Sequence, residues 1–136
     1  MEDILTNEEL INHIYKIVMV EYNLNEFYDK DIMVHSINTS ISSIKAQIGI
    51  EDDMFKYFIV DNDFKNQVVN LMLEYFRYLH FGHQGEFTTH YADDILRLSL
   101  RLVDIIKEVK YIENADIDKE EPDVDNLDLY SPPTVS

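Results

Sequence analysis

The chain has 136 residues, a formal net charge of −16 and no cysteine, which allows one domain with a sizeable core and excludes disulfides and thiolate chemistry. Its 27 acidic residues against 11 Lys and Arg argue against direct binding to duplex DNA, which needs cations clustered at the phosphates. No apolar run approaches the roughly 20 residues of a membrane-spanning helix, and the acidic start MEDILTNEEL lacks the features of a signal peptide, so we expect a soluble protein made in the cytoplasm that does not contact a membrane.

The first predicted helix begins with a capping box. Thr6 and Glu9 have the spacing at which each side chain bonds to the backbone N–H of the other at a helix start. Apolar residues then recur at helical spacing at Leu10, Ile14, Ile17 and Val18. The segment Asn23–Asn25 is predicted to end this helix.

A second helix is predicted to start near Asp29 or Asp31 and to end at 47 or 48, where Gly49 can form a C-terminal cap. Its apolar face consists of Ile37, Ile41, Ile44 and Ile48. The remaining positions are rich in Ser, Thr and Asn, which are mediocre helix formers because their side chains compete for backbone hydrogen bonds. We therefore expect packing within the subunit or between subunits to stabilise this helix.

The segment 51–62 is rich in aromatic and β-branched residues, so a short strand and a helical turn both remain open. A third helix is predicted from Phe64 to about His80, and it is apolar on several sides, which is typical of a central helix in a bundle. Gly82 is predicted to end it, and 82–87 is predicted to be a loop that holds two of the three glycines.

A fourth segment, 92–111, carries two overlapping patterns. Leucines alternate with polar residues from Leu96 to Leu102, as in a strand, whereas Ile95, Leu98, Leu102, Ile106 and Val109 mark one face of a helix. Acidic residues at its start and lysines at its end suit the helix dipole, and Leu and Arg are good helix formers. We therefore predict a helix here.

The C-terminal segment 112–136 contains all three prolines and eight acidic residues against Lys119 alone. It shows no periodicity, so we predict an acidic tail that is disordered unless it docks on a partner. It is either a passive tail or a docking segment, whose spaced apolar residues include Leu127 and Tyr130. The expected organisation is an all-α domain over 1–111, a small bundle of about four helices, followed by a flexible acidic tail over 112–136.

Sequence motifs do not indicate catalysis. His80, His83 and His90 lie close in sequence, but the paired ligand spacings of a zinc site are missing. Adjacent carboxylates such as Asp93 and Asp94 are explained by their places at helix starts. The sequence also has no nucleophile elbow, phosphate-binding loop or dinucleotide fingerprint. We therefore predict a protein that is not an enzyme and that has no metal site or cofactor.

The order of these segments resembles the head–tail connector, or adaptor, family of long-tailed bacteriophages. In that family a helix with an aspartate near its start and an apolar seam ends in a phrase like Ile44–Ile50 of this chain. An aromatic helix follows, matched by Val68–Leu79, and then a final element that opens like Phe87–Ile95. The resemblance covers about 8–102, whereas the first helix, 51–62 and the acidic tail match less well or have no counterpart.

The resemblance implies a structural virion protein made in the bacterial host cytoplasm and placed in the neck of the virion. It implies a ring of twelve copies under the portal protein, which extends the DNA channel and offers a platform for the next neck or tail-completion protein. Double-stranded DNA would pass through without specific binding, because acidic walls repel phosphates. The candidate interface residues are Ile37, Ile41, Ile44, Phe81, His83, Gln84, Phe87, Tyr91, Leu127 and Tyr130.

Two readings compete with the connector. The first is a small acidic inhibitor that mimics DNA and blocks a host nucleic-acid-binding protein, which the net charge alone suggests. The second is a helical interaction module of no specified role. The aromatic residues between Tyr75 and Tyr91 are open to two interpretations of their own, because they fit both a core and a protein–protein contact.

Overall fold

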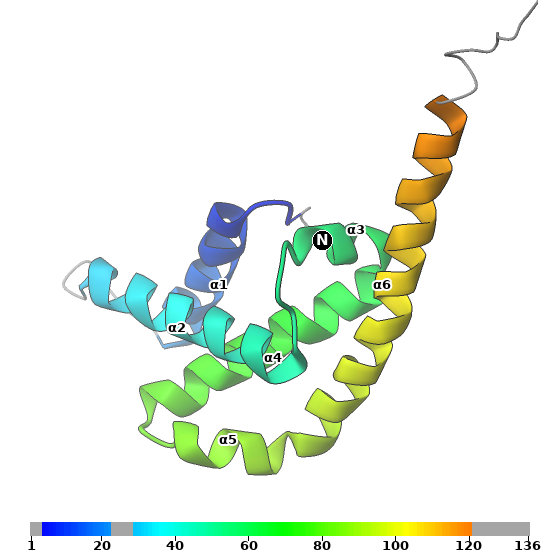
Figure 1. Cartoon of the computed structure of the whole chain (residues 1–136). Helices are drawn as coiled ribbons and strands as arrows, with labels where there is room; N and C mark the ends of the chain where they lie inside the picture. Colours follow the sequence, from blue (N-terminus) through cyan, green and yellow to red (C-terminus); the bar gives the residue numbers. More distant parts are fainter. Residues whose placement is uncertain (1–3, 23–28, 121–136) are drawn as a thin grey trace, which may run out of the picture.

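The computed structural model describes residues 4–22 and 29–120, with side chains up to residue 115, and every regular element of this part is a helix (Figure 1). The six helices are α1 (Asn7–Glu21), α2 (Lys30–Ile48), α3 (Phe55–Val60), α4 (Asn62–His80), α5 (Gln84–His90) and α6 (Ala92–Glu120). The all-α class is therefore confirmed. The expected number of about four helices is too low for the described part, because two short helices, α3 and α5, join the four long ones.

Local signals set the ends of α1 and α2. The Thr6 hydroxyl accepts a bond from the Glu9 N–H at 3.1 Å, and the Glu9 carboxylate accepts one from the Thr6 N–H at 3.0 Å. Asp29 caps α2 through its carboxylate, and Gly49 ends that helix in the left-handed conformation at φ 98°. The predicted capping box and both predicted ends of α2 are thus confirmed.

The open choice over 51–62 is settled as helix, because α3 occupies six of these residues. Asp61 separates α3 from α4 and caps α4, since its carboxylate accepts the Phe64 N–H at 3.0 Å. Helix α4 is central, as its several apolar sides predicted, and it packs against α2, α3, α5 and α6.

The predicted loop over 82–87 is wrong beyond its first residues. Gly82 leaves α4 with φ 75°, but the chain turns back into α5 by Gln84. The helix is held by Phe87, which is fully buried and whose ring lies 5.1 Å from that of Tyr75 and 5.4 Å from that of Tyr78. Burial of one aromatic ring therefore stabilises a short helix that local sequence signals did not indicate.

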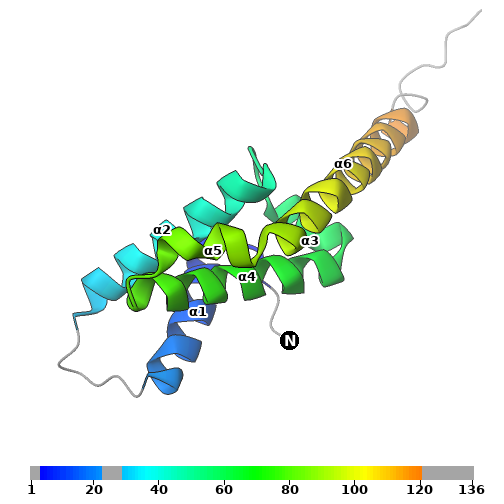
Figure 2. The same cartoon turned by 90° about the horizontal axis from the view of Figure 1, so that it is seen from below.

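Helix α6 differs from the prediction in its length. It is helical from the start, as predicted, but it continues through the expected boundary at 111 and 112 as far as Glu120. Ala, Glu and Lys in 113–120 are good helix formers, which offsets the lack of apolar periodicity there. The remaining part of the predicted tail, 121–136, lies outside the described residues. Figures 1 and 2 both show the end of α6 projecting past α3, away from the other helices.

One hydrophobic core joins all six helices. The Ser99 hydroxyl on α6 also donates to the Ile48 carbonyl at the end of α2, at 3.0 Å, and this bond holds α6 against α2. The start of α2 lies on one side of the molecule and α6 on the other (Figures 1 and 2). None of the described helices is long and apolar enough to cross a membrane.

Candidate interaction surfaces

Helix α6 carries two apolar stripes on opposite sides. Residues on the side that packs against the other helices are buried, among them Leu98, Leu102 and Ile105. Leu96, Leu100 and Val103 follow at steps of four and three residues on the other side, and Leu100 is 63% exposed. We call these three residues the outer stripe. A globular domain usually needs only one apolar stripe on a peripheral helix, so a second one that faces solvent indicates a contact surface.

The two stripes also explain the strand-like alternation in the sequence. Leu98 and Leu102 belong to the buried side and Leu96 and Leu100 to the exposed side, so every second residue is apolar although the segment is helical. The outer stripe was absent from the residues expected at an interface. The alternation of leucines with polar residues, interpreted as a helix, would have predicted this outer stripe from the sequence.

A second surface lies where α4 meets α5. Phe81 is 63% exposed at this corner, beside a groove of about 420 Å³ lined by Arg77, Tyr78, Phe81, His83, Glu86 and His90. The Phe81 ring contacts the Tyr22 ring edge-on at 6.1 Å, so the end of α1 supports the corner from one side. We call this site the α4–α5 groove. It combines an apolar ring with polar groups at its rim, as protein–protein contact sites do.

An ion-pair network holds Arg77, one of the residues that line the α4–α5 groove. Arg77 donates to Glu21 at 2.6 and 2.7 Å and to Glu74 at 2.7 Å. The hydrogen bond with Arg77 lowers the pKa of Glu21, and the Glu21 bond in turn raises the pKa of Arg77. Burial raises the pKa of the adjacent Tyr22 to about 12, with the Glu21 charge acting in the same direction. Two carboxylates on one guanidinium leave this network with a net negative charge beside the groove.

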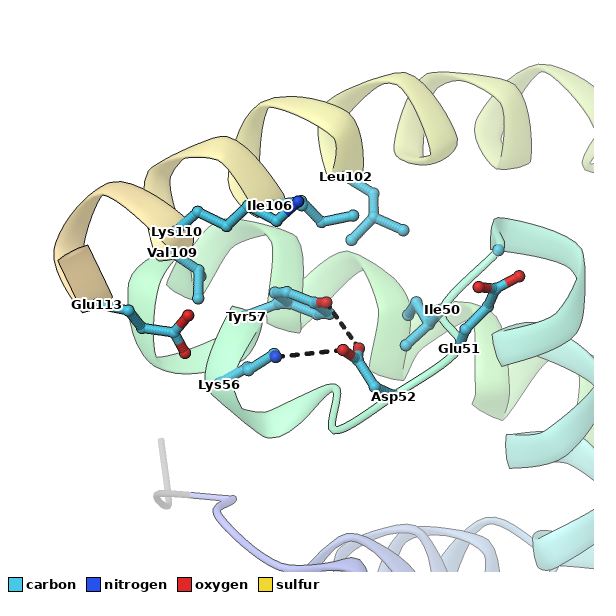
Figure 3. Close-up of a pocket in the computed structure, with 11 residues that line it drawn as sticks. Ile50, Glu51, Asp52, Lys56, Tyr57, Leu102, Ile106, Val109, Lys110 and Glu113 are labelled. Atoms are coloured by element: carbon cyan, nitrogen blue, oxygen red, sulfur yellow. Dashed lines mark hydrogen bonds and ion pairs between the residues drawn. The ribbon is translucent and has the colours of Figure 1, made fainter.

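A third hollow, of about 330 Å³, lies between α3 and the middle of α6 (Figure 3). Leu102 and Val109 of α6 form apolar walls, and Lys56 and Tyr57 of α3 both point toward Asp52. Asp52 accepts the Tyr57 hydroxyl at 2.7 Å and the Lys56 ammonium at 3.2 Å.

These contacts fix the protonation states of the two titratable partners in the hollow between α3 and α6. The bond from Tyr57 lowers the pKa of Asp52, so the carboxylate stays ionised. Burial, followed by the bond to Asp52, raises the pKa of Tyr57 to about 12, so the phenol keeps its proton. A phenol held protonated is a poor general base at neutral pH.

Two histidines of the α4–α5 region, His80 and His90, pack against aromatic rings. His80 stacks on Tyr22 with ring centroids 4.5 Å apart, and His90 Nδ1 lies 2.7 Å from the Tyr78 hydroxyl. No group of three His, Cys, Asp or Glu side chains that could hold a metal ion occurs among the residues that the structure describes.

The residues expected at an interface divide into three groups. Ile37, Ile41 and Ile44 of α2 and Phe87 of α5 are buried in the core of the subunit, so they are not available to another protein in this fold. Phe81, His83 and Gln84 are exposed at the α4–α5 corner, and Tyr91 is half-buried beside Phe87. Leu127 and Tyr130 lie outside the described residues.

Comparison with known proteins gives no match to this chain, whether with models of protein families, with characterised proteins or with solved structures.

Proposed function

We propose that this protein is a structural subunit of a head–tail connector ring in the virion of a long-tailed bacteriophage. The outer stripe of α6 is the observation that carries the proposal. These three side chains lie outside the core of the subunit, and their grouping on one exposed helix face supports a contact with another molecule. The order of segments that resembles the connector family specifies which kind of assembly this is.

Assembly into a ring needs two different surfaces on each subunit. A contact between unlike surfaces joins copies head to tail, and it forms a ring when the rotation between copies closes. The outer stripe and the α4–α5 groove are two such surfaces on different parts of one molecule. The resemblance to connectors supplies the twelve copies, the portal protein on one side of the ring and the next neck protein on the other.

The acidic composition is consistent with a channel for DNA. A net charge of −16 on each subunit would surround passing DNA with negative charge. Binding to duplex DNA gains free energy mainly when cations replace the counterions at the phosphates. A wall of carboxylates offers no such gain, so the DNA would move through the ring without being held.

The proposal is tested by mixing the purified protein with rings of the portal protein from the same genome. We expect ring-shaped particles with an added layer by negative-stain electron microscopy, and a discrete large species by sedimentation velocity. Leu100→Glu should abolish the layer, whereas Ile59→Glu, at a residue of α3 that is 70% exposed, should leave it intact. A protein that stays monomeric and ignores the portal would overturn the proposal. Tight binding to a nuclease, competed by DNA, would favour the DNA-mimic function instead.

A further inference from the structure

We infer that the outer stripe of α6 in one copy packs into the α4–α5 groove of the next copy. This inference rests on the proposed ring, because it names the two surfaces that join neighbouring subunits. Each surface carries exposed apolar side chains, which are Leu96, Leu100 and Val103 on the helix and the Phe81 ring in the lining of the groove. A helix that lays an apolar edge into a groove is a common mode of recognition.

Charge identifies a second copy of this chain as the occupant of the groove. Residues 92–111 carry four acidic and four basic side chains, whereas the rest of the chain has 23 acidic and seven basic ones. The whole net charge of −16 therefore lies outside this segment. Copies of so acidic a protein repel each other over most of their surface, and the part of α6 over 92–111 is where one copy can approach another without this repulsion.

The charges of the two surfaces are also complementary. Lys107 continues the outer stripe by one further helical step, so a cation lies in line with the apolar residues. The groove presents Glu86 at its rim, and its single guanidinium, on Arg77, is outnumbered by two carboxylates. A helix segment without net charge and with an exposed lysine therefore meets an acidic aromatic groove. This complementarity favours packing of the outer stripe in the groove over packing of two outer stripes against each other.

The geometry favours a head-to-tail contact over a two-fold one. The α4–α5 corner lies at the end of α5 that is far from α6 (Figure 1), and the stripe residues are exposed, so they do not fill the groove of their own copy. A two-fold antiparallel pair of α6 helices, centred between Leu100 and Val103, would place Leu96 opposite Lys107 of the other copy. It would also leave Phe81 in water. The head-to-tail contact covers both apolar surfaces and can close into a ring.

The absence of cysteine from the sequence makes crosslinking a clean test. Leu100→Cys marks the stripe, His83→Cys marks the groove, and Ile59→Cys marks an exposed residue of α3 as the control. Each variant, and each equimolar mixture, is treated with a short bismaleimide under assembly conditions with portal rings. We expect a covalent dimer from the mixture of the L100C and H83C proteins. Each protein alone, and each mixed with the I59C protein, should give at least tenfold less.

The double variant L100C/H83C adds a second readout. Head-to-tail contacts should produce a ladder of covalent oligomers that stops at the number of subunits in the ring. A covalent dimer from the L100C protein alone would mean two-fold packing of α6 and would overturn the inference. Absence of the mixed crosslink, with the protein folded by circular dichroism, would overturn it equally.

These results separate the contact from the proposed function. Portal-bound rings that form without the L100C–H83C crosslink would refute this pairing and leave the connector function standing. Crosslinked closed oligomers that do not bind the portal would support the pairing and refute the connector. Because crosslinking and portal binding are measured independently, each proposal can fail alone.

Discussion

The guanidinium of Arg77 on α4 forms two hydrogen bonds with the carboxylate of Glu21 at the end of α1, at 2.7 Å from Nε and 2.6 Å from Nη2. The two residues are 56 positions apart in the sequence, so this pair joins the N-terminal helix to the centre of the bundle. Paired hydrogen bonds of this kind are geometrically specific, and only arginine can form them. A third bond, to Glu74, extends the pair into a network.

Replacement of Arg77 by methionine should lower the free energy of unfolding by about 1 to 2 kcal/mol at pH 7, since it removes charge-assisted bonds in a partly exposed network. The folded protein lowers the pKa of Glu21, so this stabilisation is present above its ordinary value of 4.5 and is lost as pH falls through the folded value. Urea denaturation at pH 7 and at pH 3 should therefore show a smaller difference between the two proteins in acid. Arg97→Met, which removes a more exposed pair with Asp94, is the control and should have less effect. If Arg77→Met and Arg97→Met lowered the free energy of unfolding equally, the prediction would be contradicted.

Asp61 has two partners, and their separate contributions can be measured. Its carboxylate caps α4 at Phe64 and also pairs with Arg101 of α6. Burial alone would raise the pKa of Asp61, but the Phe64 N–H and Arg101 outweigh it and lower the pKa. Asp61→Ala should cost about 1 to 2 kcal/mol in the free energy of unfolding, mostly from the lost cap.

The control for Asp61 lies two residues further on. Asp63→Ala removes an exposed carboxylate from the first turn of the same helix without removing the cap, and it should cost clearly less than Asp61→Ala. Arg101→Gln keeps the cap and removes only the ion pair, in which the arginine is half exposed to water, so it should cost clearly less than Asp61→Ala. If Arg101→Gln proved as costly as Asp61→Ala, the ion pair and not the cap would be the main stabilising contact.

Alanine substitutions at two glycines with different backbone conformations should have opposite effects on the free energy of unfolding. Gly49 ends α2 at φ 98°, where a side chain is strained, and Gly49→Ala should cost about 1 to 2 kcal/mol. Gly85 lies within α5 without a positive φ, and a Cβ built there has no neighbour within 4 Å. Gly85→Ala should therefore stabilise the protein, by up to about 1 kcal/mol. Thermal and urea denaturation of both variants would check the signs, and a stabilising Gly49→Ala would contradict the account of the cap.

The helix ends were predictable because their causes are local. Thr6 with Glu9, Asp29 and Gly49 each act within one helical turn, so the sequence around them is sufficient. Short α5 was not predictable in this way. Its stability depends on Phe87 packing against Tyr75 and Tyr78 of α4, and glycines on either side of the segment's start favoured a loop.

The candidate surfaces show a different limit. The isoleucine face of α2 was correctly recognised as a face that must be covered, but α2 is covered within its own subunit. Periodicity shows that a helix has an apolar side and does not show what covers it. On α6 two apolar stripes at helical spacing overlapped into a strand-like pattern, which obscured the exposed one. Contacts as distant as that of Arg77 with Glu21 leave no local signal at all.

Phe81 and Phe87 were expected to contribute together to an interface, and the structure predicts opposite effects for them. Phe87 is fully buried, so Phe87→Ala should lower the free energy of unfolding by about 3 to 5 kcal/mol through lost burial and the cavity left behind. Phe81 is 63% exposed, so Phe81→Ala should change it by no more than about 0.5 kcal/mol. Urea denaturation of the isolated subunit measures both values. The order should reverse for assembly: Phe81→Ala should weaken ring formation while the subunit stays folded, because that ring lies beside the groove that receives α6. Full assembly of a folded Phe81→Ala protein would show that the Phe81 ring contributes nothing to the contact.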